Sequence, residues 1–363
     1  MKKKGGILWY ILIGILVVAL AVIVAVALSK DKTPSGEGNT PIVDDSNDHS
    51  NEIGGGIDHG NDEAPPKAET GNDVFVMFGV DSRSGGLGRG TRSDSIMLIR
   101  LDHDAKQVKV VSIYRETLVY QEGRGYKLLN AAHSYGGPEF ALSVINENFD
   151  FNIEHYCSVD FDAVGDLVDM VGGVEIELTE DEIQHINGYI TETNSVRGTN
   201  SPHITEPGVH LLDGTQAVSF SRIRYTVGYD YKRTERQREV LFKIFEQSKQ
   251  MTTDERLEVV ETLIGEVNTN YSEDEMLVLM YYLSEYEIAK MTAYPQVFFA
   301  GSIPEASSVQ IPYTLIEMNA ELHKILLGEE DYEPSDKVQQ YNDELCDKVS
   351  GPNKDMREEK DGE

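Results

Sequence analysis

Residues 74–80 read VFVMFGV and are followed directly by Asp81 and, two residues later, by Arg83. A nearly continuous apolar run of this length is typical of a strand that is buried on both faces of a sheet. Ligands of open α/β sheets collect at strand ends, so the charged residues after this run mark a candidate site. The loop that follows is rich in glycine, which lets a ligand approach the backbone. Its spacing matches neither a Walker A loop nor a dinucleotide fingerprint.

The next two predicted strands, at residues 95–101 and 108–114, carry the same kinds of charged residue at their ends. Arg92 and Asp94 immediately precede the first of them, and Arg115 follows the second. Three consecutive segments therefore present Asp or Arg at one predicted rim of the sheet.

Strand-like and helix-like patterns alternate along the rest of the chain. This alternation predicts an α/β domain whose central mixed sheet is flanked by helices on both faces. Between residues 186 and 212 we expect a long polar loop that forms a lid or an acceptor-binding insertion. The other expected strands are 155–160, 174–178, 296–300 and 309–311, and the expected helices are 138–149, 161–171, 213–220, 235–251, 254–267, 273–283 and 313–327.

The N-terminus predicts one transmembrane helix. Residues 7–28 are uncharged and long enough for the roughly 20 residues that span a bilayer. Lysines within residues 1–6 precede this run and acidic residues dominate after it, so we expect a cytoplasmic N-terminus and a single-pass protein of the cell membrane with its main domain outside the cytoplasm. A cleaved signal peptide is the alternative, since Ala25 and Ala27 lie near the end of the run.

Two segments have compositions typical of disorder. Residues 29–72 are rich in Gly, Asp, Asn, Ser and Pro and predict a flexible acidic linker. Residues 329–363 are highly charged and predict a disordered tail. The folded domain is therefore expected at residues 73–328.

The charge distribution narrows the choice of ligands. A formal charge of −31 argues against a nucleic-acid partner, which would need a basic face. The 14 arginines are nevertheless clustered, with six in residues 83–124 and five in residues 222–238. They either converge around an anion or are solvated surface residues. The two cysteines, Cys157 and Cys346, lie in dissimilar contexts and suggest neither a disulfide scaffold nor a zinc site.

The second arginine cluster has spacings that suit an anion. Arg222 and Arg224 would share a face on an extended segment, and Arg233 and Gln237 would share a face on a helix. One guanidinium group can donate two parallel hydrogen bonds to the oxygens of a phosphate. The N-terminus of a helix also favours an anion, because its free N–H groups and peptide dipoles point toward it. The alternative is that Arg233 and its neighbours pair with adjacent glutamates on a solvated helix.

Over roughly residues 73–328 the sequence resembles the LytR-CpsA-Psr family of bacterial envelope proteins. The order and spacing of the matching segments carry the resemblance: FGVDSR (78–83), TRSDSIMLIRLD (91–102), VVSIYRETLV (110–119), KLLNAAHSYGG (127–137), IEHYCSVDF (153–161), LVDMVGGVEIEL (167–178), LDGTQAVSFSRIR (212–224), DYKRTERQ (230–237) and VNTNYSEDEML (267–277).

The resemblance implies a phosphotransferase that moves an anionic glycopolymer, of the wall teichoic acid or capsular polysaccharide type, from a polyprenyl-pyrophosphate carrier to peptidoglycan. It implies an apolar pocket for the polyprenyl chain beneath the sheet, and Mg²⁺ (or Mn²⁺) held by Asp81 and Asp94. Transferred position by position, the residues that would contact the pyrophosphate are Arg92, Arg115, Arg222, Arg224, Asp230, Arg233 and Gln237. Tyr114 and Lys232 depart from the proline and glycine that are usual in the family.

Charge chemistry gives these residues their expected roles. Fixed arginines such as Arg92 and Arg115 would stabilise the leaving pyrophosphate, and Asp81 or Asp94 would accept the proton of the attacking hydroxyl. Two other functions stay open at this stage. One is hydrolysis of the polyprenyl pyrophosphate, and the other is a non-enzymatic module that binds polyprenyl lipids.

Overall fold

The computed structural model describes residues 71–80, 86–224, 229–248, 251, 255, 259, 267–272, 275, 286–296, 298–303, 306–312 and 314–348. In these ranges no helix is long and apolar enough to span a bilayer. Several predictions lie outside them: the anchor at 7–28, nearly all of the linker at 29–72, Asp81, and most of the helices expected at 254–267 and 273–283.

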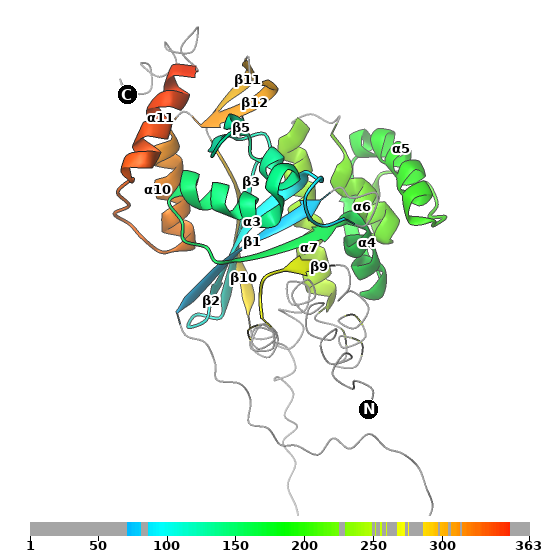
Figure 1. The fold of residues 1–363 in the computed structure, drawn as a ribbon. Helices are drawn as coiled ribbons and strands as arrows, with labels where there is room; N and C mark the ends of the chain where they lie inside the picture. Colours follow the sequence, from blue (N-terminus) through cyan, green and yellow to red (C-terminus); the bar gives the residue numbers. More distant parts are fainter. Residues whose placement is uncertain are drawn as a thin grey trace, which may run out of the picture.

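A six-stranded mixed sheet forms the centre of the molecule (Figure 1). Its order is β10 (Glu287–Tyr294), β3 (Gln107–Ile113), β2 (Ser93–Asp102), β1 (Asn72–Val80), β6 (His155–Asp160) and β9 (Val267–Thr269). Strand β1 pairs antiparallel with β2 and parallel with β6, while β3 pairs antiparallel with β2 and parallel with β10. The predicted α/β fold with a mixed central sheet is confirmed.

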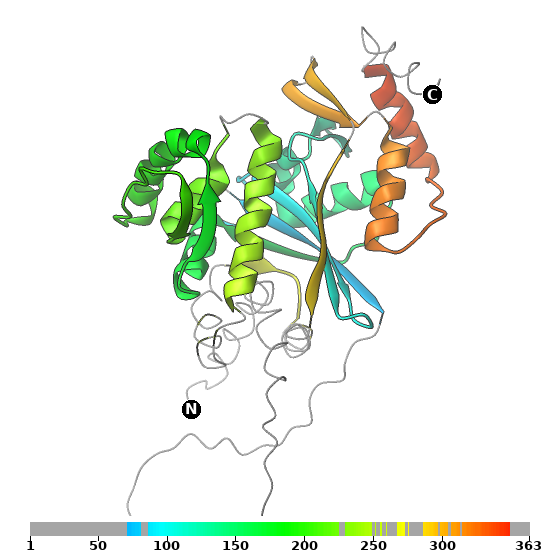
Figure 2. The same cartoon turned by 180° about the vertical axis from the view of Figure 1, so that it is seen from behind.

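Alternate side chains of the central strand enter two separate cores. Phe75 and Met77 pack in one core, and Val76 and Phe78 pack in the other. The second core is covered by α3 (Asn130–Phe149), α10 (Leu315–Leu326) and α11 (Asp336–Lys348). The first is covered by α4 (Phe161–Met170), α5 (Glu180–Arg197), α6 (Gly214–Arg222) and α7 (Tyr229–Ser248), as seen from behind in Figure 2. A strand buried on both faces explains the unbroken apolar run at residues 74–80.

The predicted polar loop at residues 186–212 is wrong. Most of it belongs to helix α5 and to strand β8 (Gly208–Leu212), which pairs with β7 (Val174–Leu178). Thr179 and Glu182 begin α5 with a reciprocal capping box, and three isoleucines at helical spacing, Ile183, Ile186 and Ile190, are buried. A capping box and a narrow apolar stripe are enough to form a helix in an otherwise polar segment.

The predicted disorder of the C-terminal tail is wrong for residues 336–348. This segment is helix α11, and the residues that it buries are Val338, Tyr341 and Leu345, on one face. They pack in the same core as α3 and α10. The high charge of the segment lies on the opposite, solvated face, so average composition concealed an amphipathic helix.

Several element boundaries also differ from the prediction. Helix α3 begins at Asn130, eight residues before the expected start at residue 138, and is kinked at Gly137, which has a φ of 83°. Helix α7 begins at Tyr229. Strand β10 and the β4–β5 hairpin (Leu118–Gln121 and Gly125–Leu128) were not predicted. The expected strands at 296–300 and 309–311 pair as β11 (Phe298–Ile303) and β12 (Ala306–Pro312).

We expect Gly214→Ala to lower the free energy of unfolding by about 1–3 kcal/mol, because overpacked contacts force the backbone to shift. Gly214 begins α6, and an added methyl group there would overlap the carbonyl oxygen of Gly165 in α4. Gly188→Ala is the matched control, because no atom beyond the adjacent residues and the local helix backbone lies within 4 Å of the added methyl group. In the interior of α5 it should stabilise by about 0.5–1 kcal/mol. Chemical denaturation measures both, and equal effects would contradict this account.

Candidate functional site: an arginine cluster around Asp94

Asp94, the second residue of β2, lies at the centre of three guanidinium groups. Its Oδ1 accepts a hydrogen bond from Arg115 at 2.8 Å. Its Oδ2 accepts one from Arg233 at 2.8 Å and another from Arg224 at 3.2 Å. Residues 94, 115, 224 and 233, which are distant in sequence, therefore converge at one place.

The fold explains why these four residues meet. Strands β2 and β3 are antiparallel, so the start of β2 and the end of β3, where Arg115 follows, lie at the same edge of the sheet. Arg224 comes two residues after the end of α6, and Arg233 lies in the second turn of α7. The edge of the sheet thus supplies the carboxylate and one arginine, and the α6–α7 region supplies the other two.

The charges of this cluster hold Asp94 ionised. Burial by itself would raise the pKa of Asp94, but the charges of Arg233 and Arg115 and the hydrogen bonds that they donate together lower that pKa to about 2. Asp94 is therefore a carboxylate at neutral pH. So low a pKa also makes it a weak base, which argues against Asp94 as the acceptor of a substrate proton.

The three arginines differ in exposure, which indicates different roles. The side chain of Arg233 is 3% exposed, that of Arg115 is 16% exposed and that of Arg224 is 41% exposed. The Nε of Arg115 also contacts Glu116 at 2.5 Å. Arg233 is buried and fixed in place, whereas the exposed guanidinium group of Arg224 is accessible to a ligand.

Gln237 lies one turn after Arg233 on α7 and is buried. Its amide nitrogen finds no hydrogen-bond partner among the described residues. Buried polar atoms are nearly always satisfied, so an amide donor without a partner beside this cluster is suited to a ligand oxygen.

The other predicted site residues lie differently. Arg222 is the last residue of α6 and contacts α5 through Glu192 at 3.2 Å and Thr193 at 3.1 Å. It therefore does not share the contacts of Arg224. Arg92 is exposed and makes no ion pair within the described ranges. The side chain of Asp230 and all of Asp81 lie outside the described part of the chain, so their roles stay predictions.

Arg236 and Glu182 lie beside the site and were not predicted from the sequence. Arg236 donates to Glu182, the capping residue of α5, at 2.8 Å, and to the carbonyl oxygen of Ile223 at 3.1 Å. It thereby joins α7, α5 and the segment that leads to Arg224. The alternative of Arg233 and Arg236 pairing with adjacent glutamates on a solvated helix is wrong, since both are buried and bond to distant carboxylates. The capping-box pattern at Thr179–Glu182 was visible in the sequence and would have placed Glu182 at the start of a helix.

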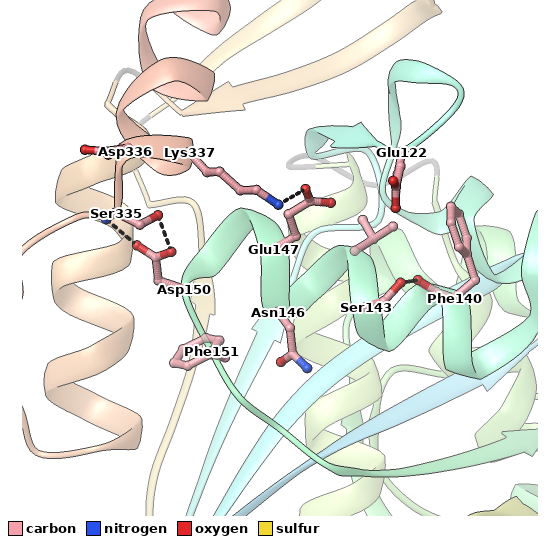
Figure 3. Close-up of a pocket in the computed structure, with 11 residues that line it drawn as sticks. Glu122, Phe140, Ser143, Asn146, Glu147, Asp150, Phe151, Ser335, Asp336 and Lys337 are labelled. Atoms are coloured by element: carbon pink, nitrogen blue, oxygen red, sulfur yellow. Dashed lines mark hydrogen bonds and ion pairs between the residues drawn. The ribbon is translucent and has the colours of Figure 1, made fainter.

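A cavity of about 680 Å³ lies elsewhere, between α3 and α11 (Figure 3). Two of its four carboxylates are partnered: Asp150 accepts hydrogen bonds from Ser335, and Glu147 accepts one from Lys337. None of the residues that line it belongs to the arginine cluster. The contacts of Asp150 and Glu147 join α3 to α11 and to the residue that precedes it.

The fold and the site together define a mixed α/β domain in which three guanidinium groups gather around one carboxylate at a sheet edge. The chain belongs to the LytR_cpsA_psr family, whose model matches residues 42–314. This match confirms the resemblance carried by the sequence segments.

Named relatives and one solved structure agree with the family. The chain is 28% identical, over 235 residues that are 62% of it and 70% of the relative, to the polyisoprenyl-teichoic acid–peptidoglycan teichoic acid transferase TagT of Bacillus subtilis. It is also 28% identical to the regulatory protein MsrR of Staphylococcus aureus, over 56% of this chain and 58% of MsrR. The structure of TagT (YwtF) with bound octaprenyl pyrophosphate lipid is similar in fold, with a TM-score of 0.52 at 22% identity, and covers 70% of this chain and 90% of TagT.

Proposed function

We propose that this protein transfers an anionic glycopolymer, of the wall teichoic acid or capsular polysaccharide type, from a polyprenyl-pyrophosphate carrier to peptidoglycan. The convergence of Arg115, Arg224 and Arg233 on Asp94 is the observation that carries the proposal. Family membership and the transferase name of TagT support it. The bound lipid in the TagT structure indicates the class of carrier.

In the proposed reaction a hydroxyl group of the acceptor attacks the phosphorus next to the glycopolymer. A new phosphorus–oxygen bond forms, the bond to the polyprenyl phosphate breaks, and the hydroxyl proton leaves to a base. Negative charge grows on the departing phosphate. Arg115 and Arg233 are held in place before the substrate binds, so they stabilise this charge without reorganising. Gln237 adds an amide donor for a phosphate oxygen.

Magnesium or manganese is part of the proposal. A carboxylate offers about four lone-pair sites, and three arginine donors occupy three of those on Asp94. One site on Oδ1 therefore stays open, which suits an ion that takes one or two carboxylates plus phosphate oxygens. In the described ranges no group of three or more acidic, His or Cys side chains could hold a metal. Asp94 and Asp81 would therefore share the ion with the substrate, and the ion would neutralise phosphate charge.

The proposed location follows from the predicted anchor at residues 7–28. A polyprenyl carrier is embedded in a membrane, and a single-pass anchor followed by a tether would keep the domain near it. The domain would then act outside the cytoplasm, where the pyrophosphate of the donor supplies the activation. An apolar pocket for the polyprenyl chain beneath the sheet is part of the same proposal.

The test uses the full-length protein in detergent with a labelled polyprenyl-pyrophosphate glycopolymer. We expect label to move to peptidoglycan when both acceptor and Mg²⁺ are present, and transfer to stop when EDTA is added. Release of free glycopolymer without acceptor, at the same rate, would favour the hydrolase. Saturable lipid binding without any turnover would favour the binding module, and either result would overturn the transferase proposal.

A further inference from the structure

Two arginines from separate segments stack on one exposed tyrosine. Tyr135, in the first half of α3, is 45% exposed. The guanidinium carbon of Arg124 lies 4.2 Å from the centre of its ring, and that of Arg89 lies 5.8 Å away. Phe140 supports the ring at 5.3 Å in an edge-to-face contact. We name Arg89, Arg124 and Tyr135 the Tyr135 platform.

The arginines of the platform differ from most other described arginines in their ion pairing. Most described arginines, including Arg100 and Arg197, form ion pairs with carboxylates. Arg89 and Arg124 form none within the described ranges, although the chain has 63 acidic residues against 32 basic ones. An aromatic ring attracts a cation through its π-face without neutralising it. The N–H donors of a guanidinium group suit the oxygens of a phosphate.

Arg124 is also held in place by hydrogen bonds to neighbouring residues. Its Nη1 donates to the side chain of Gln121 and, at 3.5 Å, to the carbonyl oxygen of Ala131. Gln121 is itself buried and donates to the carbonyl oxygen of Leu128 at 3.0 Å. The guanidinium group is therefore oriented before any ligand arrives, which lowers the entropy that binding must overcome.

The platform is tied to the segment that leads into the candidate site. The N–H of Gly90 donates to the carbonyl oxygen of Ser134 at 3.0 Å, and the ring of His133 bonds to the carbonyl oxygen of Thr91 at 2.9 Å. Arg89 lies five residues before Asp94, so their backbones are at most about 18 Å apart. The exposed Arg92 lies between them in sequence.

We propose that the Tyr135 platform binds the phosphodiester chain of the donor beyond its pyrophosphate. The proposal rests on the transferase function and names the class of substrate: a glycopolymer with a repeating phosphate in its backbone. While the Asp94 cluster binds the pyrophosphate, Arg89 and Arg124 bind phosphates further along the same molecule. A neutral polysaccharide would gain nothing from these two arginines.

The experiment compares two donors with the full-length protein. Both carry polyprenyl pyrophosphate and a disaccharide, and one is extended by several alditol-phosphate units. For Arg89→Ala combined with Arg124→Ala, and separately for Tyr135→Ala, we expect KM for the extended donor to rise about tenfold, as for the loss of one or two charge-assisted contacts. The turnover number, and both constants for the short donor, should not change. Tyr135→Phe keeps the ring, and Lys290→Ala removes an exposed charge from β10, so both should match wild type.

The outcomes separate this inference from the proposed function. Equal changes with both donors would indicate a structural role and overturn the inference, as would no change with either. If the wild type transfers neither donor, the proposed function fails, and binding of a soluble poly(glycerol phosphate) oligomer then tests the platform alone. Binding that weakens about tenfold in the double arginine variant, with a smaller dependence on salt, supports the platform. Arg89 is exposed, so Arg89→Ala by itself reports the loss of charge if the double variant does not fold.

Discussion

Arg115→Ala is expected to lower kcat and kcat/KM for glycopolymer transfer together, by about 30- to 1000-fold. This corresponds to the roughly 2–4 kcal/mol that one preorganised donor contributes to a developing anion. Arg115 is suited to this role because its guanidinium is held on both sides, by Asp94 at 2.8 Å and by Glu116 at 2.5 Å. Steady-state kinetics with the labelled donor measures the effect.

Two further variants make the interpretation of Arg115→Ala specific. Arg115→Lys keeps the charge but loses the paired donors, and should recover only part of the rate. Lys290→Ala removes an exposed charge from β10 that makes no contact with the cluster among the described residues, and it should leave both constants unchanged. Transfer by Arg115→Ala within threefold of wild type, with an unchanged KM, would show that this arginine does not contact the reacting phosphate.

Asp94→Asn is expected to lower the free energy of unfolding by about 3 kcal/mol at neutral pH. The substitution leaves Arg233, whose side chain is 3% exposed, beside Arg115 without the carboxylate that compensates both. Removing one partner of a buried ion pair usually costs about 3–5 kcal/mol. Urea denaturation of the wild type and the variant measures the difference. A variant as stable as wild type would mean that these guanidinium groups are solvated and do not converge.

The pH dependence of this difference has a definite sign. The pKa of Asp94 is lowered from 3.8 to about 2 in the folded protein. Its ionised form therefore stabilises the fold above about pH 4 by roughly 2–3 kcal/mol, and this contribution is lost as the pH falls from about 4 to about 2. The stability gap between wild type and Asp94→Asn should shrink over that window. A constant gap would contradict the lowered pKa.

The central strands could be predicted from the sequence because both faces of the sheet are covered. Residues 74–80 have no solvent-facing side, so their apolar run is unbroken and needs no tertiary information to interpret. Helices α5 and α11 were missed for the opposite reason. Each buries only a few side chains on one face, and the rest of each helix is polar or charged. The average composition of such a helix is dominated by its exposed face, whereas its folding depends on the few apolar residues of its buried face.

The site shows a similar division between what sequence can and cannot indicate. Arg115, Arg224 and Arg233 were predicted to converge with Asp94, and the structure brings them together. Their position at strand and helix ends was visible in the chain. Arg222 was expected to share a face with Arg224 on an extended segment, but α6 continues through Arg222 and turns it toward Glu192. Just after the end of α6, the carbonyl oxygen of Ile223 accepts a hydrogen bond from Arg236 of α7, a tertiary contact that no local pattern specifies.

The carboxylate of Asp94 has a consequence for selectivity. It accepts hydrogen bonds from three like-charged groups and so keeps them close together. Acetate or chloride, with a single negative charge, offers those groups no more than Asp94 already supplies. A pyrophosphate carries several charges and would be attracted to the three guanidinium groups more strongly than a monovalent anion. Under the proposed function, the cluster would therefore favour a polyvalent headgroup over the monovalent anions of the surroundings.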